Sequence, residues 1–159
     1  MSVATATLNS WKGRDLSREP NLSGADLHEA NLPKADLPRA DLPRADLARA
    51  NLSEADLMSA NLESANLLRA ILFRADLPRA ELSEAKLCGT NLTEADLSGA
   101  NLAGADLSGV DLAQAILVGA ILTGADLSTV SLTQEELELA IGDENTRVPP
   151  GLNPPRTGA

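Results

Sequence analysis

Leucine recurs at every fifth position over most of the chain. From Leu22 to Leu132 the spacing is unbroken through 23 leucines. A small residue stands two positions before each leucine, and from position 25 to position 130 it is alanine in 19 of 22 units. The residue between them is Asp or Asn in 17 of the 23 units, so the unit reads Ala-(Asp/Asn)-Leu-x-x. The dominant signal is an internal repeat with a period of five.

Neither an α-helix nor a long β-strand buries this pattern. On a helix, five residues turn through about 500°, so successive leucines would point about 140° apart and form no apolar stripe. In a strand, an odd period puts successive leucines on opposite faces. A chain that turns every five residues instead directs each Ala and Leu, two positions apart, toward one interior. The pattern therefore predicts an all-β solenoid filled by stacked Leu and Ala.

The other two residues of each unit carry turn chemistry. Within the array proline stands only at the first turn position, as in Pro33 and Pro78, and glycine only at the second, as in Gly24 and Gly99. Type II turns favour this order, because their third residue needs a positive φ. A period of 20 gives the most orderly columns and favours four units per coil. One such column consists of Asp36, Asp56, Asp76 and Asp96.

The two ends of the array differ from its interior. Residues 1–20 fall outside the five-residue phase, and we expect them to cover the first coil as an N-terminal cap with Trp11 as its apolar lid. The repeat domain is predicted to span residues 21–132. Residues 143–159 hold four prolines and two glycines and are expected to form an irregular tail.

A short helix is predicted between the repeats and the tail, over residues 133–142. Thr133 and Glu136 have the spacing of a capping box. The helix is expected to run through Ile141, to stop at Gly142, and to cover the last coil with one apolar face. That face consists of Leu137, Ala140 and Ile141.

The run of Ala-Asp-Leu and Ala-Asn-Leu units resembles the pentapeptide-repeat family over residues 21–134. The resemblance implies a right-handed quadrilateral β-helix with four pentapeptides per coil. It also implies that Leu and the small residue point inward, while the Asp/Asn position and both turn residues point outward. Twenty-three units make about six coils, or a rod about 28 Å long at the spacing of paired strands.

Composition and charge exclude several classes of protein. The 23 acidic and 13 basic side chains give a net charge of −10 and a pI near 4.4, which argues against direct binding of nucleic acid. No apolar run has the length of a membrane span, and the N-terminus lacks a signal-peptide pattern. We therefore expect a cytoplasmic protein with no membrane partner.

Catalytic chemistry is also missing from the pattern. His28 is the only histidine and Cys88 the only cysteine, and both stand at outward turn positions. No nucleophile–base pair, metal cluster or phosphate loop is recognisable. The sequence therefore predicts a protein that is not an enzyme, with no cofactor, no metal and no small-molecule substrate.

Two functions remain open. The first is a non-catalytic structural or protein-binding module. The second, implied by the quinolone-resistance branch of the family, is a DNA mimic that inhibits or protects a type II topoisomerase such as DNA gyrase. Residues 81–159 carry a net charge of −9 against −1 for residues 1–80. The candidate acidic face of a mimic consists of Asp96, Asp106 and Asp126.

Large apolar residues at outward positions mark candidate interaction surfaces, for a protein partner or for self-association. Leu68, Ile71 and Phe73 are predicted to span one side of the third coil, with Cys88 above Leu68. A second group around one corner consists of Ile116, Val118 and Ile121.

Overall fold

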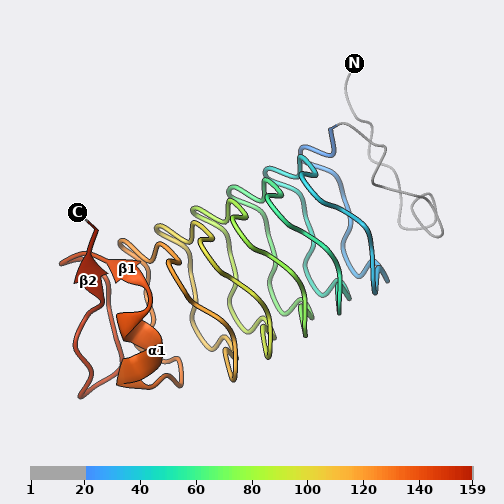
Figure 1. Ribbon diagram of the computed structural model, residues 1–159. Coiled ribbons are helices and arrows are strands. Elements are labelled where there is room, and N and C mark those ends of the chain that lie inside the picture. The colour runs from blue at the N-terminus through green and yellow to red at the C-terminus, as the bar shows by residue number, and fades with distance from the viewer. Residues whose placement is uncertain (1–20, 159) are drawn as a thin grey trace.

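The computed structural model describes residues 21–158, and over this range the chain winds into a stack of similar coils (Figure 1). Parallel bridges join residues twenty positions apart, from Asp26 with Asp46 up to Ile121 with Ile141. Four five-residue units therefore complete one coil, and each unit pairs with the unit directly above and below it. The fold is an all-β solenoid, as the period of 20 predicts. The predicted N-terminal cap, with Trp11, lies outside the described residues.

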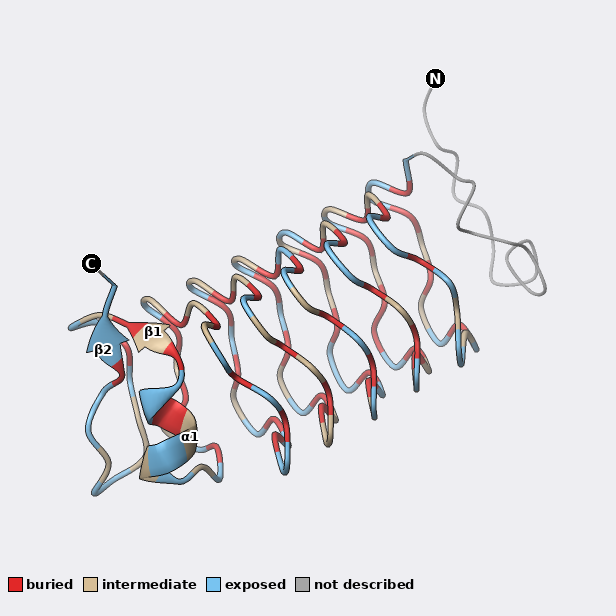
Figure 2. Cartoon of the chain, viewed as in Figure 1, coloured by how far each residue is buried: buried red, intermediate tan, exposed pale blue. Residues whose placement is uncertain are grey.

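The interior of the solenoid is built from the repeated Leu and Ala. Every repeat leucine from Leu57 to Leu97 has 0% of its surface exposed, and the buried positions recur in each coil (Figure 2). Burying one leucine side chain contributes about 1.5–3 kcal/mol, so stability is distributed along the rod. Thr90 replaces an alanine and is also buried, with its hydroxyl donating to the Leu67 carbonyl at 2.7 Å.

The unit at residues 51–55 shows how each backbone amide finds an acceptor. Its first amide donates to the preceding coil, and its second and fourth donate to the following coil, all at 2.8 Å. The fifth donates across the turn to the Leu52 carbonyl at 3.1 Å. The third, that of Ser53, donates to the Asn51 side chain at 3.1 Å. Asp or Asn thus supplies the one acceptor that the ladder lacks, which accounts for its prevalence.

Each turn requires a left-handed backbone. At every second turn position from Gly24 to Gly124, φ lies between 55° and 68°, as the predicted type II turn needs. Seven of these residues are glycine and fourteen are not, so the coil geometry also imposes this conformation on Arg, Lys, Glu, Gln and Ser. Side chains at the same corner of successive coils form ion pairs, with 3.3 Å between Lys34 Nζ and Glu54 Oε2.

The outward middle residues form four faces, which we name by a member. Around the coil the order is the Ile121 face, the Asp106 face, the Ile71 face and the aspartate face. The aspartate face, which lies opposite the Asp106 face, consists of Asp36, Asp56, Asp76, Asp96 and Ile116. The Ile71 face consists of Asn31, Asn51, Ile71, Asn91 and Asp111.

Helix α1 (Gln134–Glu138) follows the repeats, and Thr133 forms the predicted capping box with Glu136. The helix ends at Glu138 and not at Ile141 as the sequence predicts. The reason is that Ile141 rejoins the ladder, since its amide donates to the Ala120 carbonyl at 2.8 Å. Strand β1 (Ile141–Gly142) therefore begins where the helix was expected to end. Leu137 is buried as predicted, but Ile141 lies outward and is only half-buried.

The segment after β1, expected to be irregular, lies against the last coil. Strand β2 (Arg156–Thr157) pairs in parallel with β1 (Figure 1). Thr146 is 7% exposed, and Arg147 continues the ladder with Asp126. Gly142 is needed at this contact, because a Cβ there would lie 2.7 Å from Cγ of Pro155. Pairing and packing thus order a segment whose composition alone suggested irregular structure.

Candidate interaction surfaces

The first predicted surface, formed by Leu68, Ile71 and Phe73, lies on the Ile71 face and its two corners. Leu68 and Ile71 are 39% and 42% exposed. Phe73 is less exposed than these two residues, because it is half-buried and the guanidinium of Arg74 lies 4.8 Å from the centre of its ring. That guanidinium also donates to Glu94 at 2.7 Å, which raises the pKa of Arg74 above its ordinary value. The apolar part of this surface is therefore centred on Leu68 and Ile71.

Cys88 lies one coil above Leu68, as predicted. Its turn is fixed by the Arg69 amide, which donates to the Cys88 carbonyl at 3.0 Å. The thiol is free and its residue is half-buried. Cys88 therefore extends the edge of the first surface without enlarging its exposed apolar part.

The second predicted surface extends further than the sequence indicated. Ile116 and Val118 are 47% and 50% exposed, while Ile121 is half-buried. Leu139, which is 55% exposed, lies in the next layer, because its carbonyl accepts from the Gly119 amide at 2.7 Å. The next layer also contains Ile141, bridged to Ile121. We call this group of five residues the apolar corner; it consists of Ile116, Val118, Ile121, Leu139 and Ile141.

Exposed isoleucine breaks the local bonding rule of the repeat. Ile71 replaces an Asp or Asn, and the Phe73 amide that such a side chain would bind has no acceptor within residues 21–158. The same holds for the amides of Val118 and Thr123, which follow Ile116 and Ile121. Each isoleucine thus leaves a turn amide without an acceptor in the described chain. The repeat itself favours Asp or Asn at these positions, since the longer side chains of Glu81 and Lys86 do not accept the corresponding amides of Ser83 and Cys88 either.

The three acidic residues predicted as a DNA-mimic face do not lie together. Asp96 belongs to the aspartate face, whereas Asp106 and Asp126 pair with each other on the Asp106 face, opposite to it. Asp126 also accepts from the Arg147 guanidinium at 2.7 Å. Hydrogen bonding by Ser128, reinforced by that guanidinium, lowers the pKa of Asp126.

The longest row of like charge that the fold creates within residues 21–158 is the four in-register aspartates of the aspartate face. Asp56 and Asp96 each accept a turn amide at 2.9 Å. Asp36 and Asp76 precede prolines, which have no amide hydrogen to donate, and their carboxylates are left to solvent. Paired strands are about 4.8 Å apart, so the row spans three such steps.

Titratable groups elsewhere in the described part of the chain make local contacts with neighbouring units. His28 Nε2 lies 3.5 Å from Glu29 Oε1, and the His28 amide donates to Asp26 Oδ1 at 3.3 Å. Asp143 accepts from the Gly124 amide and the Thr146 hydroxyl, both at 2.9 Å, and these bonds lower its pKa to about 2. Asp143 therefore anchors the last coil through these bonds. Among residues 21–158, no group of three or more His, Cys, Asp or Glu side chains could hold a metal ion.

Among residues 21–158, no helix combines the length and the apolar character needed to cross a bilayer.

Comparison with known proteins agrees with the repeat geometry. The family model for pentapeptide repeats (8 copies) matches residues 21–57, 55–94 and 95–134. The chain belongs to the pentapeptide-repeat family. No curated protein matches it.

Solved structures of the same kind cover most of the chain. A pentapeptide repeat protein (Rfr23) from the cyanobacterium Cyanothece 51142 is 33% identical, with a TM-score of 0.52, over 84% of this chain and 94% of that one. One from the Arabidopsis thaliana thylakoid lumen is 25% identical over 89% and 86%, with a TM-score of 0.47. HetL from Nostoc sp. strain PCC 7120, involved in heterocyst differentiation regulation, is 28% identical over 86% and 82%, with a TM-score of 0.43.

Proposed function

We propose that this protein is a non-catalytic protein-binding module, a rigid rod that presents two apolar surfaces to protein partners. The observation that carries the proposal is the placement of isoleucine at outward positions where it loses a hydrogen bond. Ile71 and Ile116 are 42% and 47% exposed, and each leaves a turn amide without an acceptor in the described chain. Contiguous exposed apolar residues with polar rims mark interaction sites.

The proposed architecture is a right-handed rod of about six coils, placed in the cytoplasm. Residues 21–132 form the repeat domain, and α1 with the following segment caps its C-terminal end. Two observations support the cap. Leu137 of α1 is 0% exposed within the leucine core, and β1 continues the ladder above Ile121.

Paired surface variants test the proposal. Leu68→Ser/Ile71→Asn alters the first surface, and Ile116→Asn/Val118→Ser alters the second, so each double variant controls for the other. Each is compared with the wild type by light scattering and by quantitative capture of proteins from the native cell. We expect one of them to lose a bound protein, or a self-association, that the other retains. If wild type and both variants have the same mass and retain the same proteins, the proposal is wrong.

The DNA-mimic alternative is supported by one observation, the in-register row of carboxylates on the aspartate face. DNA carries about one charge per 1.7 Å of axis, a closer spacing than one carboxylate per coil. A gyrase supercoiling assay decides the matter. Inhibition that is lost when Asp36, Asp56, Asp76 and Asp96 become Asn would favour the mimic. Loss on neutralising Asp96, Asp106 and Asp126 instead would implicate two opposite faces. No inhibition by the wild type would exclude gyrase as the target.

A further inference from the structure

We infer that the apolar corner is the docking site for a cationic amphipathic segment of a partner protein, with the aspartate face guiding its charged part. This inference rests on the proposed function and specifies the partner's chemistry at one of the two surfaces.

The apolar corner combines exposure with unused hydrogen-bond donors. Three of its side chains, Ile116, Val118 and Leu139, are 47–55% exposed, and they lie in two adjacent layers around one corner. The Val118 amide has no acceptor among residues 21–158. In the unit below, by contrast, the Ser98 amide donates to Asp96 at 2.9 Å. A partner that buries this corner can supply both apolar contact and a carbonyl acceptor.

Charge around the corner selects the occupant. Asp96 lies one coil before Ile116 on the same face, and Glu138 precedes Leu139 at the end of α1. Arg156, bridged to Ile141, adds one positive charge at the upper edge. A second copy docked through the same corner would bring its own Asp96 and Glu138 against these carboxylates, and like charges across an interface are unfavourable. Lysine and arginine on a partner segment complement them.

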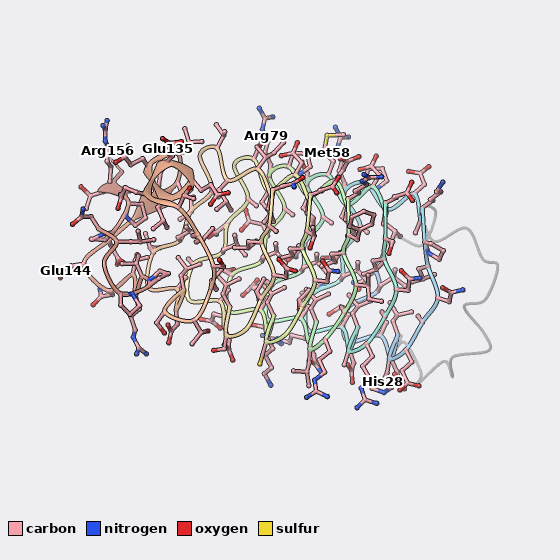
Figure 3. All side chains as sticks on the ribbon, turned by 90° about the horizontal axis from the view of Figure 1, so that it is seen from below. His28, Met58, Arg79, Glu135, Glu144 and Arg156 are labelled. Atoms are coloured by element: carbon pink, nitrogen blue, oxygen red, sulfur yellow. The ribbon has the colours of Figure 1, made fainter. Side chains whose placement is uncertain are left out.

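The aspartate face extends the favourable charge away from the corner. Four coils separate Asp36 from Ile116, about 19 Å at the strand spacing, which matches a helix of about 13 residues. Arg39 and Arg79 follow Asp36 and Asp76 in the chain and stand at one corner of this face, so two positive charges border its four carboxylates. Arg79 projects from the same long side of the rod as Met58, Glu135 and Arg156, and His28 from the opposite side (Figure 3). Asp36 and Asp76 accept no turn amide, so their carboxylates are available to partner cations. The matching segment therefore has an apolar end and a basic remainder.

A synthetic probe tests the inference directly. The probe is a fluorescent helical peptide of about 14 residues, with leucines clustered at one end and lysines along the same face. One twin replaces every lysine with glutamate, and a second replaces every leucine with serine. Binding is followed by fluorescence anisotropy at low ionic strength, where exposed charges are least screened. We expect the lysine–leucine probe to bind and both twins to bind more weakly by about tenfold or more.

Variants of the full-length protein locate the bound probe. Ile116→Asn/Val118→Ser should weaken binding by about tenfold or more. In Asp56→Asn/Asp96→Asn the Asn side-chain oxygens can still accept the turn amides. This variant should bind the probe more weakly, and its affinity for the probe should depend less on salt. Leu68→Ser/Ile71→Asn, on the other surface, should leave it unchanged. Thermal unfolding verifies that each variant folds, and Ile116→Asn supplies the acceptor that the Val118 amide lacks.

Three results would overturn the inference. The first is that the glutamate twin binds the protein as tightly as the lysine–leucine probe does. The second is that Ile116→Asn/Val118→Ser binds the probe as tightly as the wild type. The third is that the wild type is a dimer and this variant a monomer, which would make the corner an interface between copies. Failure here is distinguishable from failure of the proposed function. If the probe does not bind but a cellular protein is still captured through Leu68 and Ile71, this inference fails and the proposed function stands.

Discussion

Ser59→Gly should stabilise the protein. Ser59 is exposed and held at φ 57°, a left-handed conformation that costs an L residue about 1–2 kcal/mol. Glycine adopts it without strain but has more freedom in the unfolded chain, which costs about 0.5–1 kcal/mol. The difference is a gain of about 0.5–1 kcal/mol. The Ser59 amide donates to the Pro78 carbonyl at 2.9 Å, and glycine keeps this donor, so the ladder should be unchanged.

Two glycine substitutions provide the matched controls. Gly109 has φ 64°, and a Cβ there would have no atom within 4 Å, so Gly109→Ala should lower the free energy of unfolding by about 0.5–1 kcal/mol, the backbone strain less the entropy that glycine has in the unfolded chain. Gly142 is not left-handed, but a Cβ there would lie 2.7 Å from Pro155 and 2.9 Å from Thr146. Gly142→Ala should therefore destabilise the last coil by overlap, and a compensating Pro155→Ala should recover part of the loss.

Urea unfolding followed by circular dichroism measures these changes, with thermal unfolding as a second readout. For a chain of this size, 1 kcal/mol corresponds to a shift of about 2–4 °C. If Ser59→Gly lowers stability while Gly109→Ala leaves it unchanged, the left-handed turn carries no strain and the reasoning is wrong.

Three further predictions concern the core, the first surface and pH. Leu77→Ala should cost about 2–5 kcal/mol because Leu77 is fully enclosed; a urea midpoint equal to that of the wild type would contradict this. Ile71→Asn should raise the free energy of unfolding by about 0.5–1.5 kcal/mol, because the Asn side chain can accept the Phe73 amide. An unchanged or lower unfolding temperature would contradict the role given to Asp and Asn as acceptors of the turn amide. The lowered pKa of Asp143 means that its contribution is present above the ordinary value of 3.8 and is lost as pH falls toward about 2. The protection factor of the Gly124 amide, which corrects for the intrinsic dependence of exchange on pH, should therefore fall over that range before the central coils respond, and Asp143→Asn should remove the step.

Most of the fold is predictable because one short unit determines it. The five-residue phase requires Leu and Ala to share one interior, and the period of 20 in the aspartates corresponds to the observed bridges from Asp36 to Asp96. The end of α1 was not predictable from local signals. Local propensity carries the helix through Ile141, whereas pairing with Ile121, twenty residues earlier, holds Ile141 extended. A search for the period of 20 beyond the repeats would have detected this.

The surfaces were only partly predictable. Outward positions follow from the repeat phase, so Leu68 and Ile116 are exposed as expected. Leu139 was missed because a longer helix gave it no place beside Val118. The repeat phase also predicts an open Phe73, because nothing in the spacing of residues shows that Arg74 lies over its ring.

The pairing of each residue with the one twenty positions later has a consequence for how such a chain tolerates change in length. Removing or duplicating twenty residues shortens or extends the rod and leaves all four faces continuous. Removing a single unit, for example residues 101–105, rotates everything downstream by a quarter turn. Ile116 would then stand over Asn91 instead of Asp96, and the carboxylate row would lead to Ile121. Length changes in whole coils therefore preserve a composite surface, whereas single-unit changes recombine its parts, so the same sequence elements can be reassorted into new surfaces without altering the core.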